Sequence, residues 1–266
     1  MTRVLITGGA GELGRALAPM LQVGGYTVRG LGRRAAPATP GIEWAQVDLA
    51  SGAGLAEALQ GVEVLVHAAS SPFQNTRQTD IAGTARLIEA ARAAGVRQLV
   101  YISIVGCDQI AFDYYRAKTA AEALVQAGGV PWTTLRATQF HSLLDGLLTR
   151  LDRFPLVLAA PTAQFQPIDT GEVAARLAEL VAAGPVGRAP DIGGPEVWRL
   201  PDMARAWLAA RGRHRAVLRF PMPGEFGRAL REGRNTCPSQ RYGRVGWREW
   251  LRERYGLAAP AETIAG

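Results

Sequence analysis

The sequence predicts an α/β fold in which helices cover a parallel sheet, and three observations support this prediction. Short runs rich in β-branched residues alternate with alanine-rich helical stretches, as parallel strands alternate with crossover helices. The run at 62–69 is apolar along nearly its whole length, as expected for a strand that is covered on both faces. A glycine-rich loop joins the first strand-like run directly to the first helical stretch.

The expected elements follow one another regularly up to residue 137. Strands are expected at 3–7, 27–31, 42–49, 62–69, 97–103 and 132–137. Helices are expected at 12–24, 76–95 and 113–127, then at 170–184 and within 193–212. Prolines interrupt the pattern after residue 150, and the tail from 211 to 255 is poorly periodic. We therefore expect a large α/β domain over residues 1–194 and a smaller C-terminal cap over 195–266.

Composition indicates a soluble protein without a membrane or export signal. Of the 266 residues, 48% are hydrophobic and 20% are charged. No run approaches the roughly 18 apolar residues that span a bilayer, and the apolar run at 4–7 is too short for export. Cys107 and Cys237 lie far apart and lack the spacing of metal ligands, so we expect no disulfide, no metal and a cytoplasmic location.

The net charge of +7 raises the question of nucleic-acid binding. Arginines concentrate between 211 and 254, but acidic residues are interspersed among them and no DNA- or RNA-binding motif accompanies them. We therefore expect a solvated arginine-rich surface, part of which could attract anionic cofactors or substrates. The expected partner is a small-molecule substrate, with no nucleic acid and no membrane, and the chain is expected to be a monomer or a homodimer.

The loop "ITGGAGELGR" (6–15) predicts a dinucleotide site. Gly9, Gly11 and Gly14 form the pattern G-x-G-x-x-G, and Thr7, Gly8, Gly11 and Gly14 form T-G-x-x-G-x-x-G. Such a tight turn needs residues that tolerate positive φ, and a pyrophosphate approaches closely only where side chains are absent. The following helix N-terminus offers free amides to the phosphates. The position between a strand and a helix makes this more than an ordinary turn. The domain over 1–194 is therefore expected to bind the dinucleotide, and the cap over 195–266 is expected to bind the substrate.

Cofactor choice depends on the segment "VRGLGRR" (28–34). An acid at this point would hold the ribose hydroxyls of NAD, but none is present. Arg33 and Arg34, together with Arg29, could instead pair with a 2′-phosphate, so we expect NADP(H) rather than NAD(H). Asp48, at the end of the third expected strand, has two interpretations: it accepts from the adenine amine, or it caps the stretch that follows.

Lys118 is the only lysine of the chain, and it stands four residues after Tyr114. This spacing places both side chains on one face of the helix expected at 113–127. An ammonium near a phenol favours the phenolate and is expected to lower its pKa from about 10 toward neutrality. Tyr114 could then exchange a proton with a carbonyl oxygen, while Lys118 binds the cofactor ribose.

These motifs together resemble short-chain dehydrogenases/reductases, specifically the extended and atypical branch with NmrA-like NAD(P)H-binding members. Across residues 1–195 the matching segments are "VLITGGAGELGR", "QVDL", "VLVHAAS", "DIAGTARLIEAARAAGV", "YISIVG", "YYRAKTAAE" and "PWTTLRATQF". The resemblance implies a Rossmann-type doubly wound parallel sheet with helices on both faces, and Tyr114 and Lys118 as the catalytic pair. The expected cofactor-binding residues are Thr7, Gly8, Gly11, Glu12, Leu13, Gly14, Arg33, Arg34, Asp48, Leu49, Ala68, Ala69, Ser70 and Lys118.

The run "YISIVG" (101–106) departs from the family pattern. Members of the branch place a catalytic serine just after the fifth strand, where the best alignment puts Ile104. Ser103 stands one residue earlier and would face the opposite side of a continuing strand. Either Ser103 completes the catalytic site from a shifted turn, or the partner of the oxyanion is missing.

Four residues are expected near the substrate, each with core packing as its alternative. They are Phe73, Gln139, Phe140 and His141, and a packed histidine is the commoner role for the last of them. His67 is expected to be structural.

The sequence thus predicts an NADPH-dependent reductase of a small carbonyl compound, or the reverse dehydrogenase, that uses a Tyr-Lys pair. An alternative is a non-catalytic NmrA-like redox sensor that binds NADP(H), which the run "YISIVG" favours. A weaker alternative is a nucleotide-sugar epimerase or dehydratase that retains NAD, against which the absent acid after the second strand argues.

Overall fold

The computed structural model describes residues 1–34, 40–72, 75–153 and 157–256, and the chain divides into two compact units. The first unit contains residues 1–137 and 170–192, and the second contains 138–169 and the chain from 193 onward. The chain therefore passes between the units three times. The last crossing lies beside the boundary expected at residue 194, whereas residues 138–169, expected in the first domain, belong to the second unit.

A parallel sheet of seven strands forms the centre of the first unit. The strands are β1 (Arg3–Thr7), β2 (Thr27–Gly32), β3 (Glu43–Gln46), β4 (Val64–His67), β5 (Gln98–Ile104), β6 (Trp132–Ala137) and β9 (Gly187–Arg188). Their order is β3-β2-β1-β4-β5-β6-β9, and every neighbouring pair is parallel. The chain first moves outward from β1 to β3 and then restarts at β4 on the other side of β1. This doubly wound order confirms the predicted fold class, and such sheets bind ligands where the order reverses, at the carboxyl ends of β1 and β4.

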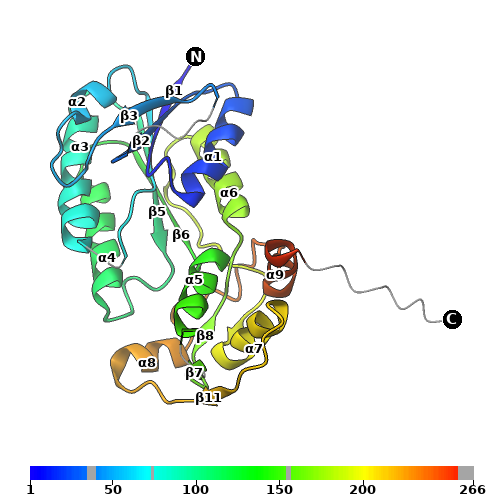
Figure 1. Ribbon diagram of the computed structural model, residues 1–266. Coiled ribbons are helices and arrows are strands. Elements are labelled where there is room, and N and C mark those ends of the chain that lie inside the picture. Colours follow the sequence, from blue (N-terminus) through cyan, green and yellow to red (C-terminus); the bar gives the residue numbers. More distant parts are fainter. Residues whose placement is uncertain (35–39, 73–74, 154–156, 257–266) are drawn as a thin grey trace. The chain divides into compact units, whose positions relative to one another are not determined.

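Helices cover both faces of this sheet. They are α1 (Glu12–Val23), α2 (Leu55–Ala58), α3 (Gly83–Ala93), α4 (Asp113–Ala127) and α6 (Thr170–Ala183), with a π-helical turn η1 (Arg77–Ala82) before α3. Figure 1 shows α2, α3 and α4 on one side of the sheet and α1 and α6 on the other. All residues of β4 are buried, as predicted for a doubly covered strand. The helix expected over 76–95 is confirmed, although its first turn is π-helical.

The second unit combines short strands with helices. Its elements are α5 (His141–Leu151), β7 (Val157–Ala159), β8 (Gln164–Phe165), β10 (Trp198–Arg199), α7 (Leu200–Ala210), β11 (Val217–Arg219), α8 (Gly224–Arg231) and α9 (Trp247–Tyr255). Strand β10 pairs antiparallel with β8, and β11 pairs parallel with β7. Trp207 of α7 and Trp247 of α9 lie in one apolar core and are fully buried. Among the helices of the described ranges, none is long and apolar enough to cross a membrane.

Candidate active site

The loop after β1 is shaped by its glycines. Gly8 has φ +68°, and a Cβ built on it would lie 3.0 Å from the Cα of Ala69. A Cβ on Gly14 would lie 2.6 Å from the carbonyl oxygen of Gly8, and Gly11 donates its N–H to that same oxygen at 2.8 Å. Side chains at these positions would collide with backbone, so the loop offers bare backbone at the start of α1. This cradle fits the pyrophosphate of a dinucleotide.

Thr7 fixes the segment after β4 beside this loop. Its hydroxyl oxygen accepts hydrogen bonds from the N–H groups of Ala68 and Ala69, both at 3.0 Å. The segment expected to pass the cofactor therefore lies against Gly8, but the two amides already have a partner in Thr7. What this segment offers a ligand is its small side chains and the residue that follows, Ser70.

His67 is held neutral at the end of β4. Its Nδ1 lies 2.7 Å from the Thr7 hydroxyl, and its Nε2 lies 2.9 Å from the hydroxyl of Thr84. Since Thr84 donates its hydroxyl hydrogen to the carbonyl of Asp80, it accepts from Nε2, and Thr7 donates to Nδ1. Burial, with the nearby charge of Lys118, lowers the pKa of His67 to about 3. The structural role expected for His67 agrees with these contacts.

Two exposed arginines, Arg33 and Arg34, follow β2. The Gln46 side chain donates to the carbonyl of Arg33 at 3.2 Å, and the Trp44 indole donates to the carbonyl of Arg34 at 3.0 Å. Within the described ranges, neither guanidinium has an ion-pair or hydrogen-bond partner. Strand β3 therefore anchors the backbone of this segment and leaves both cationic heads available to a ligand.

Arg29 cannot join these two arginines, contrary to expectation. Its guanidinium contacts the carboxylate of Glu43 at 2.7 Å and donates to the carbonyl of Ala58 at 2.6 Å. The ion pair holds the pKa of Glu43 below its usual value, although burial alone would raise it. Arg29 thus ties β2 to β3 and to the end of α2.

Other residues expected at the cofactor have mixed placements. Asp48 is exposed and accepts from the N–H of Ala50 at 3.0 Å, which closes a turn; it does not cap a helix as its second interpretation predicts, because the N-cap of α2 is Gly54. Leu49 and Leu13 point into the core. Glu12, in the first turn of α1, accepts a hydrogen bond from the hydroxyl of Thr170 at 2.7 Å.

Lys118 lies buried on α4 with 2% of its surface exposed. Its ammonium donates to the carbonyl of Ile102 at 2.8 Å and lies 4.4 Å from the ring centroid of Tyr101. The ring of Tyr101 in turn stacks on the ring of His67, with 5.3 Å between their centroids. Because His67 contacts Thr7, the lysine is linked through these rings to the end of β1. Burial lowers the pKa of Lys118 to about 8, and no carboxylate in the described part of the chain pairs with it directly. An ammonium has three donors, so two remain for a ligand.

Tyr114 lies half-buried one helical turn before Lys118. Its hydroxyl is 3.1 Å from the hydroxyl of Ser70, which donates to the carboxylate of Asp80 at 2.5 Å. Burial raises the pKa of Tyr114 to about 12; the bond to Ser70 opposes this rise and the charge of Asp80 adds to it. The expectation that Lys118 lowers this pKa is therefore wrong for the protein alone, because the ammonium is directed at Ile102 and Tyr101.

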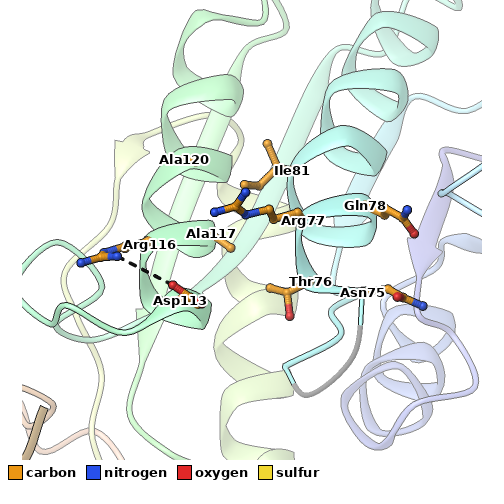
Figure 2. Close-up of a pocket in the computed structure, with 9 residues that line it drawn as sticks. All are labelled: Asn75, Thr76, Arg77, Gln78, Ile81, Asp113, Arg116, Ala117 and Ala120. Carbon is orange, nitrogen blue, oxygen red and sulfur yellow. Dashed lines mark ion pairs between the residues drawn. The ribbon is translucent and has the colours of Figure 1, made fainter.

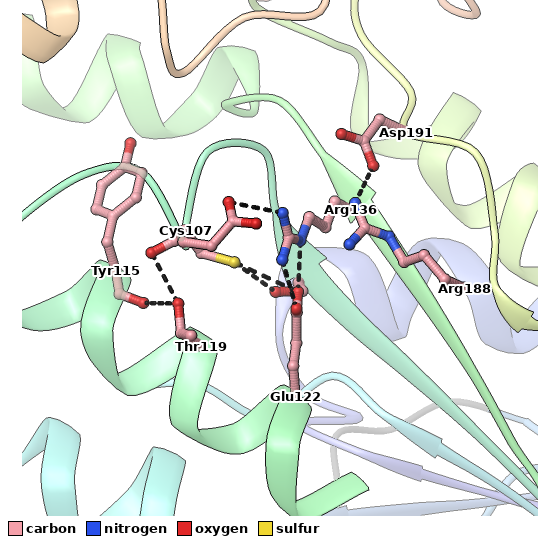
Figure 3. A network of polar contacts seen from close by, with 9 residues as sticks. Cys107, Tyr115, Thr119, Glu122, Arg136, Arg188 and Asp191 are labelled. Carbon is pink, nitrogen blue, oxygen red and sulfur yellow. Dashed lines mark hydrogen bonds and ion pairs between the residues drawn. The ribbon is translucent and has the colours of Figure 1, made fainter. Parts of the chain in front are cut away.

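Ser103 belongs to a different cluster. Its hydroxyl lies 3.8 Å from the Cys107 thiol. Figure 3 shows that the sulfur of Cys107, 3.4 Å from Glu122, lies beside the ion pair between Glu122 and Arg136. Burial, together with the charge of Glu122, raises the pKa of the Cys107 thiol to about 11. In the described structure, the residue in contact with the Tyr114 hydroxyl is Ser70 and not Ser103.

Residues expected near the substrate lie in the second unit or outside the described ranges. Gln139 donates to the carbonyl of Asn235 at 2.9 Å. Phe140 precedes α5 and forms an isolated bridge with Ile168. His141 is buried, lies 3.0 Å from the Val245 carbonyl, and stacks on two tryptophans of α9. Phe73 lies outside the described residues.

Asp80 was missed by the sequence reasoning. It is 1% exposed, and its second carboxylate oxygen accepts from the N–H of Ser71 at 2.9 Å. A signal existed, because Asp80, Thr84, Leu87 and Ala91 follow one another at helical spacing and all are buried. An acid on such an otherwise buried face needs a specific partner.

An open pocket of about 780 Å³ lies between η1 and α4 (Figure 2). Arg77 and Gln78 of η1 line it from one side, and Asp113 and Arg116 of α4, paired at 3.7 Å, line it from the other. Neither Tyr114 nor Lys118 is among its lining residues. The two predicted catalytic side chains thus occupy a different face of α4.

Comparison with known proteins shows the family. A family profile described as NAD(P)H-binding matches residues 8–153. The (4-alkanoyl-5-oxo-2,5-dihydrofuran-3-yl)methyl phosphate reductase of Streptomyces griseus is 33% identical over 202 residues, which are 73% of this chain and 68% of the relative. Quinone oxidoreductase 2 of Escherichia coli is 28% identical over 76% of this chain and 72% of its own length.

A solved structure extends the likeness to nearly the whole chain. The NADPH-dependent quinone oxidoreductase QOR2 of Escherichia coli, complexed with NADPH, superposes with a TM-score of 0.78. The alignment covers 95% of this chain and 99% of that one at 19% identity. At this level of identity the likeness shows the fold.

Proposed function

Because the chain belongs to the NAD(P)H-binding family within the short-chain dehydrogenase/reductase superfamily, and so is an NAD(P)-dependent oxidoreductase, we propose that it uses NADPH to reduce a small carbonyl compound. The observation that carries this proposal is the half-buried phenol of Tyr114 one turn from the buried ammonium of Lys118, on the helix beside β5. The names of two relatives, a quinone oxidoreductase and a furanone phosphate reductase, support a carbonyl-bearing substrate.

Each part of the site has a role in this proposal. The glycine loop between Gly8 and Gly14 would hold the pyrophosphate, and Arg33 with Arg34 would hold the 2′-phosphate. The two remaining donors of Lys118 would bind the ribose hydroxyls. Bound NADPH would supply the hydride. Tyr114, whose high pKa keeps it protonated at neutral pH, would donate its hydroxyl proton to the carbonyl oxygen.

The first test combines binding with turnover. We expect the protein to enhance NADPH fluorescence on mixing, and at least one aldehyde, ketone or quinone in a panel to oxidise the bound NADPH, followed at 340 nm. Absence of binding at millimolar NADPH would remove the proposal. Tight binding without oxidation by any compound in the panel would instead indicate the redox-sensor alternative.

Cofactor preference is tested at the end of β2. The double replacement Arg33→Ala/Arg34→Ala should weaken NADPH binding about 10²- to 10⁴-fold, because it removes two charge-assisted hydrogen bonds that contribute roughly 1.5–3 kcal/mol each. NADH binding should change little, because NADH lacks the 2′-phosphate. Fluorescence titration of both cofactors measures the two constants, and Arg92→Ala, an exposed arginine of α3, is the matched control. Equal weakening for NADH and NADPH would contradict the assignment.

A further inference from the structure

We propose that Ser70 and Asp80 form a proton relay to Tyr114, in which Ser70 takes the place at the phenol that Ser103 was expected to occupy. The proposal rests on the proposed function and extends it by two residues. Three groups from three separate elements meet here: Tyr114 from α4, Asp80 from η1, and Ser70 from the segment after β4. Both contacts are within hydrogen-bond distance, at 3.1 Å and 2.5 Å.

The direction of each hydrogen bond follows from the chemistry of the groups. A carboxylate only accepts, and one oxygen of Asp80 already accepts from the N–H of Ser71. Ser70 therefore donates its hydrogen to the other oxygen, and its lone pair accepts from the Tyr114 hydroxyl. Asp80 thus orients Ser70, and Ser70 touches the oxygen that gives up the proton.

Exposure differs along the relay in a way that suits proton supply. Asp80 is buried at 1% exposure, Tyr114 is half-buried, and Ser70 is exposed. A proton from solvent can reach the phenol through Ser70 without opening the protein. The buried carboxylate at the inner end stabilises each proton that passes along the hydroxyl.

The relay also borders the dinucleotide cradle. Ser70 directly follows Ala68 and Ala69, whose N–H groups bind Thr7, and Ala69 lies against Gly8. The backbone of Ala68 and Ala69, which packs against the glycine loop, therefore also fixes the position of Ser70 beside that loop.

The proton balance of the relay is simple. Tyr114 gives its hydroxyl proton to the substrate oxygen and becomes a phenolate. Ser70 then gives its own proton to the phenolate and regains one from water at its exposed side, so each turnover consumes one solvent proton. Asp80 remains a carboxylate throughout and acts as a positioning residue.

The test measures the pKa of the phenol at position 114 and, separately, the turnover of the enzyme. Difluorotyrosine placed at position 114 lowers the phenol pKa into a range below alkaline unfolding, and its ¹⁹F signal reports ionisation without substrate or cofactor. Titratable groups around this position are Asp80 on η1, Tyr101 on β5, and Tyr115 and Lys118 on α4. Asp80→Asn should lower the pKa at position 114, because the Asp80 charge opposes ionisation. Ser70→Ala should raise this pKa, because Ser70 turns its hydrogen to the phenolate once position 114 is ionised, and Ser70→Thr should restore it.

Turnover gives the second readout. Asp80→Asn and Ser70→Ala should each lower kcat by about tenfold or more, since proton transfer by a positioned group contributes 10²–10⁴-fold, with a smaller change in NADPH dissociation. Asp113→Asn, which neutralises the exposed neighbour of Tyr114, is the control for charge. Unchanged ionisation at position 114 in both variants would overturn the relay. Loss of NADPH binding or of all turnover in the unaltered protein would instead overturn the proposed function, while the ¹⁹F titration still decides whether Asp80 acts on the phenol.

Discussion

Replacing Tyr114 by Phe should lower kcat by about 10²- to 10⁴-fold, because the phenol is the proposed proton donor to the carbonyl oxygen. The phenylalanine ring keeps the packing of the tyrosine ring, including the edge-to-face contact with Tyr115, whose ring centroid lies 6.3 Å away. The fold should therefore be preserved. The measurement is NADPH oxidation with the best substrate from the panel, together with a fluorescence titration of NADPH.

The expected pattern separates chemistry from binding. The dissociation constant for NADPH should stay close to that of the unaltered protein, since the hydroxyl of Tyr114 bonds Ser70 and is not assigned to the cofactor phosphates. Replacing the neighbouring Tyr115 by Phe is the matched control. Turnover that survives in the Tyr114 variant would exclude Tyr114 as the proton donor.

The largest effect on stability is expected at Arg136. Its guanidinium binds the Glu122 carboxylate through two contacts at 2.7 Å and 2.6 Å, and both side chains are more than nine-tenths buried. Burial alone would raise the pKa of Glu122, but Arg136 brings it below its usual value. Arg136→Met should lower the free energy of unfolding by about 3–5 kcal/mol, because it leaves a buried carboxylate unpaired. Urea denaturation measures this change.

Two further variants test the cause of this loss. The double replacement Glu122→Gln/Arg136→Met removes both charges and should recover most of the stability. Asp108→Asn removes the more exposed partner of the same arginine, 47% exposed, and should cost only about 0–1 kcal/mol. A double variant no more stable than the single one would show that lost packing, rather than an unpaired charge, governs this position.

The sequence predicted the first unit closely because its signals are local. Strands 3–7 and 132–137 and the helix 113–127 appear with the expected bounds, since each has a clear hydrophobic period and a glycine or proline nearby. The glycine loop was recognisable because a side chain at any of its glycines would collide with neighbouring backbone. Helix α9 was missed because charged residues dominate it, while Trp247 and Leu251 alone mark its buried face.

The arrangement of side chains at the site was harder to predict, because it depends on contacts between distant segments. Sequence spacing placed Tyr114 and Lys118 on one helix face, but not the direction of the ammonium toward Ile102 and Tyr101. In the same way, Arg29 stood beside Arg33 in sequence, yet its guanidinium is held by Glu43. No local sequence pattern predicts the contacts of Lys118 with Ile102 and Tyr101, or the ion pair of Arg29 with Glu43.

The three crossings of the chain between its units have a consequence for how this protein can be cut or shuffled. Removing everything after residue 194 would leave β7 without β11 and β8 without β10, because each of these small sheets draws its two strands from both sides of the cut. The second unit is therefore not continuous in sequence, and it cannot be exchanged at one junction. Exchanging the second unit requires two coordinated splices, one around residues 138–169 and one after residue 192.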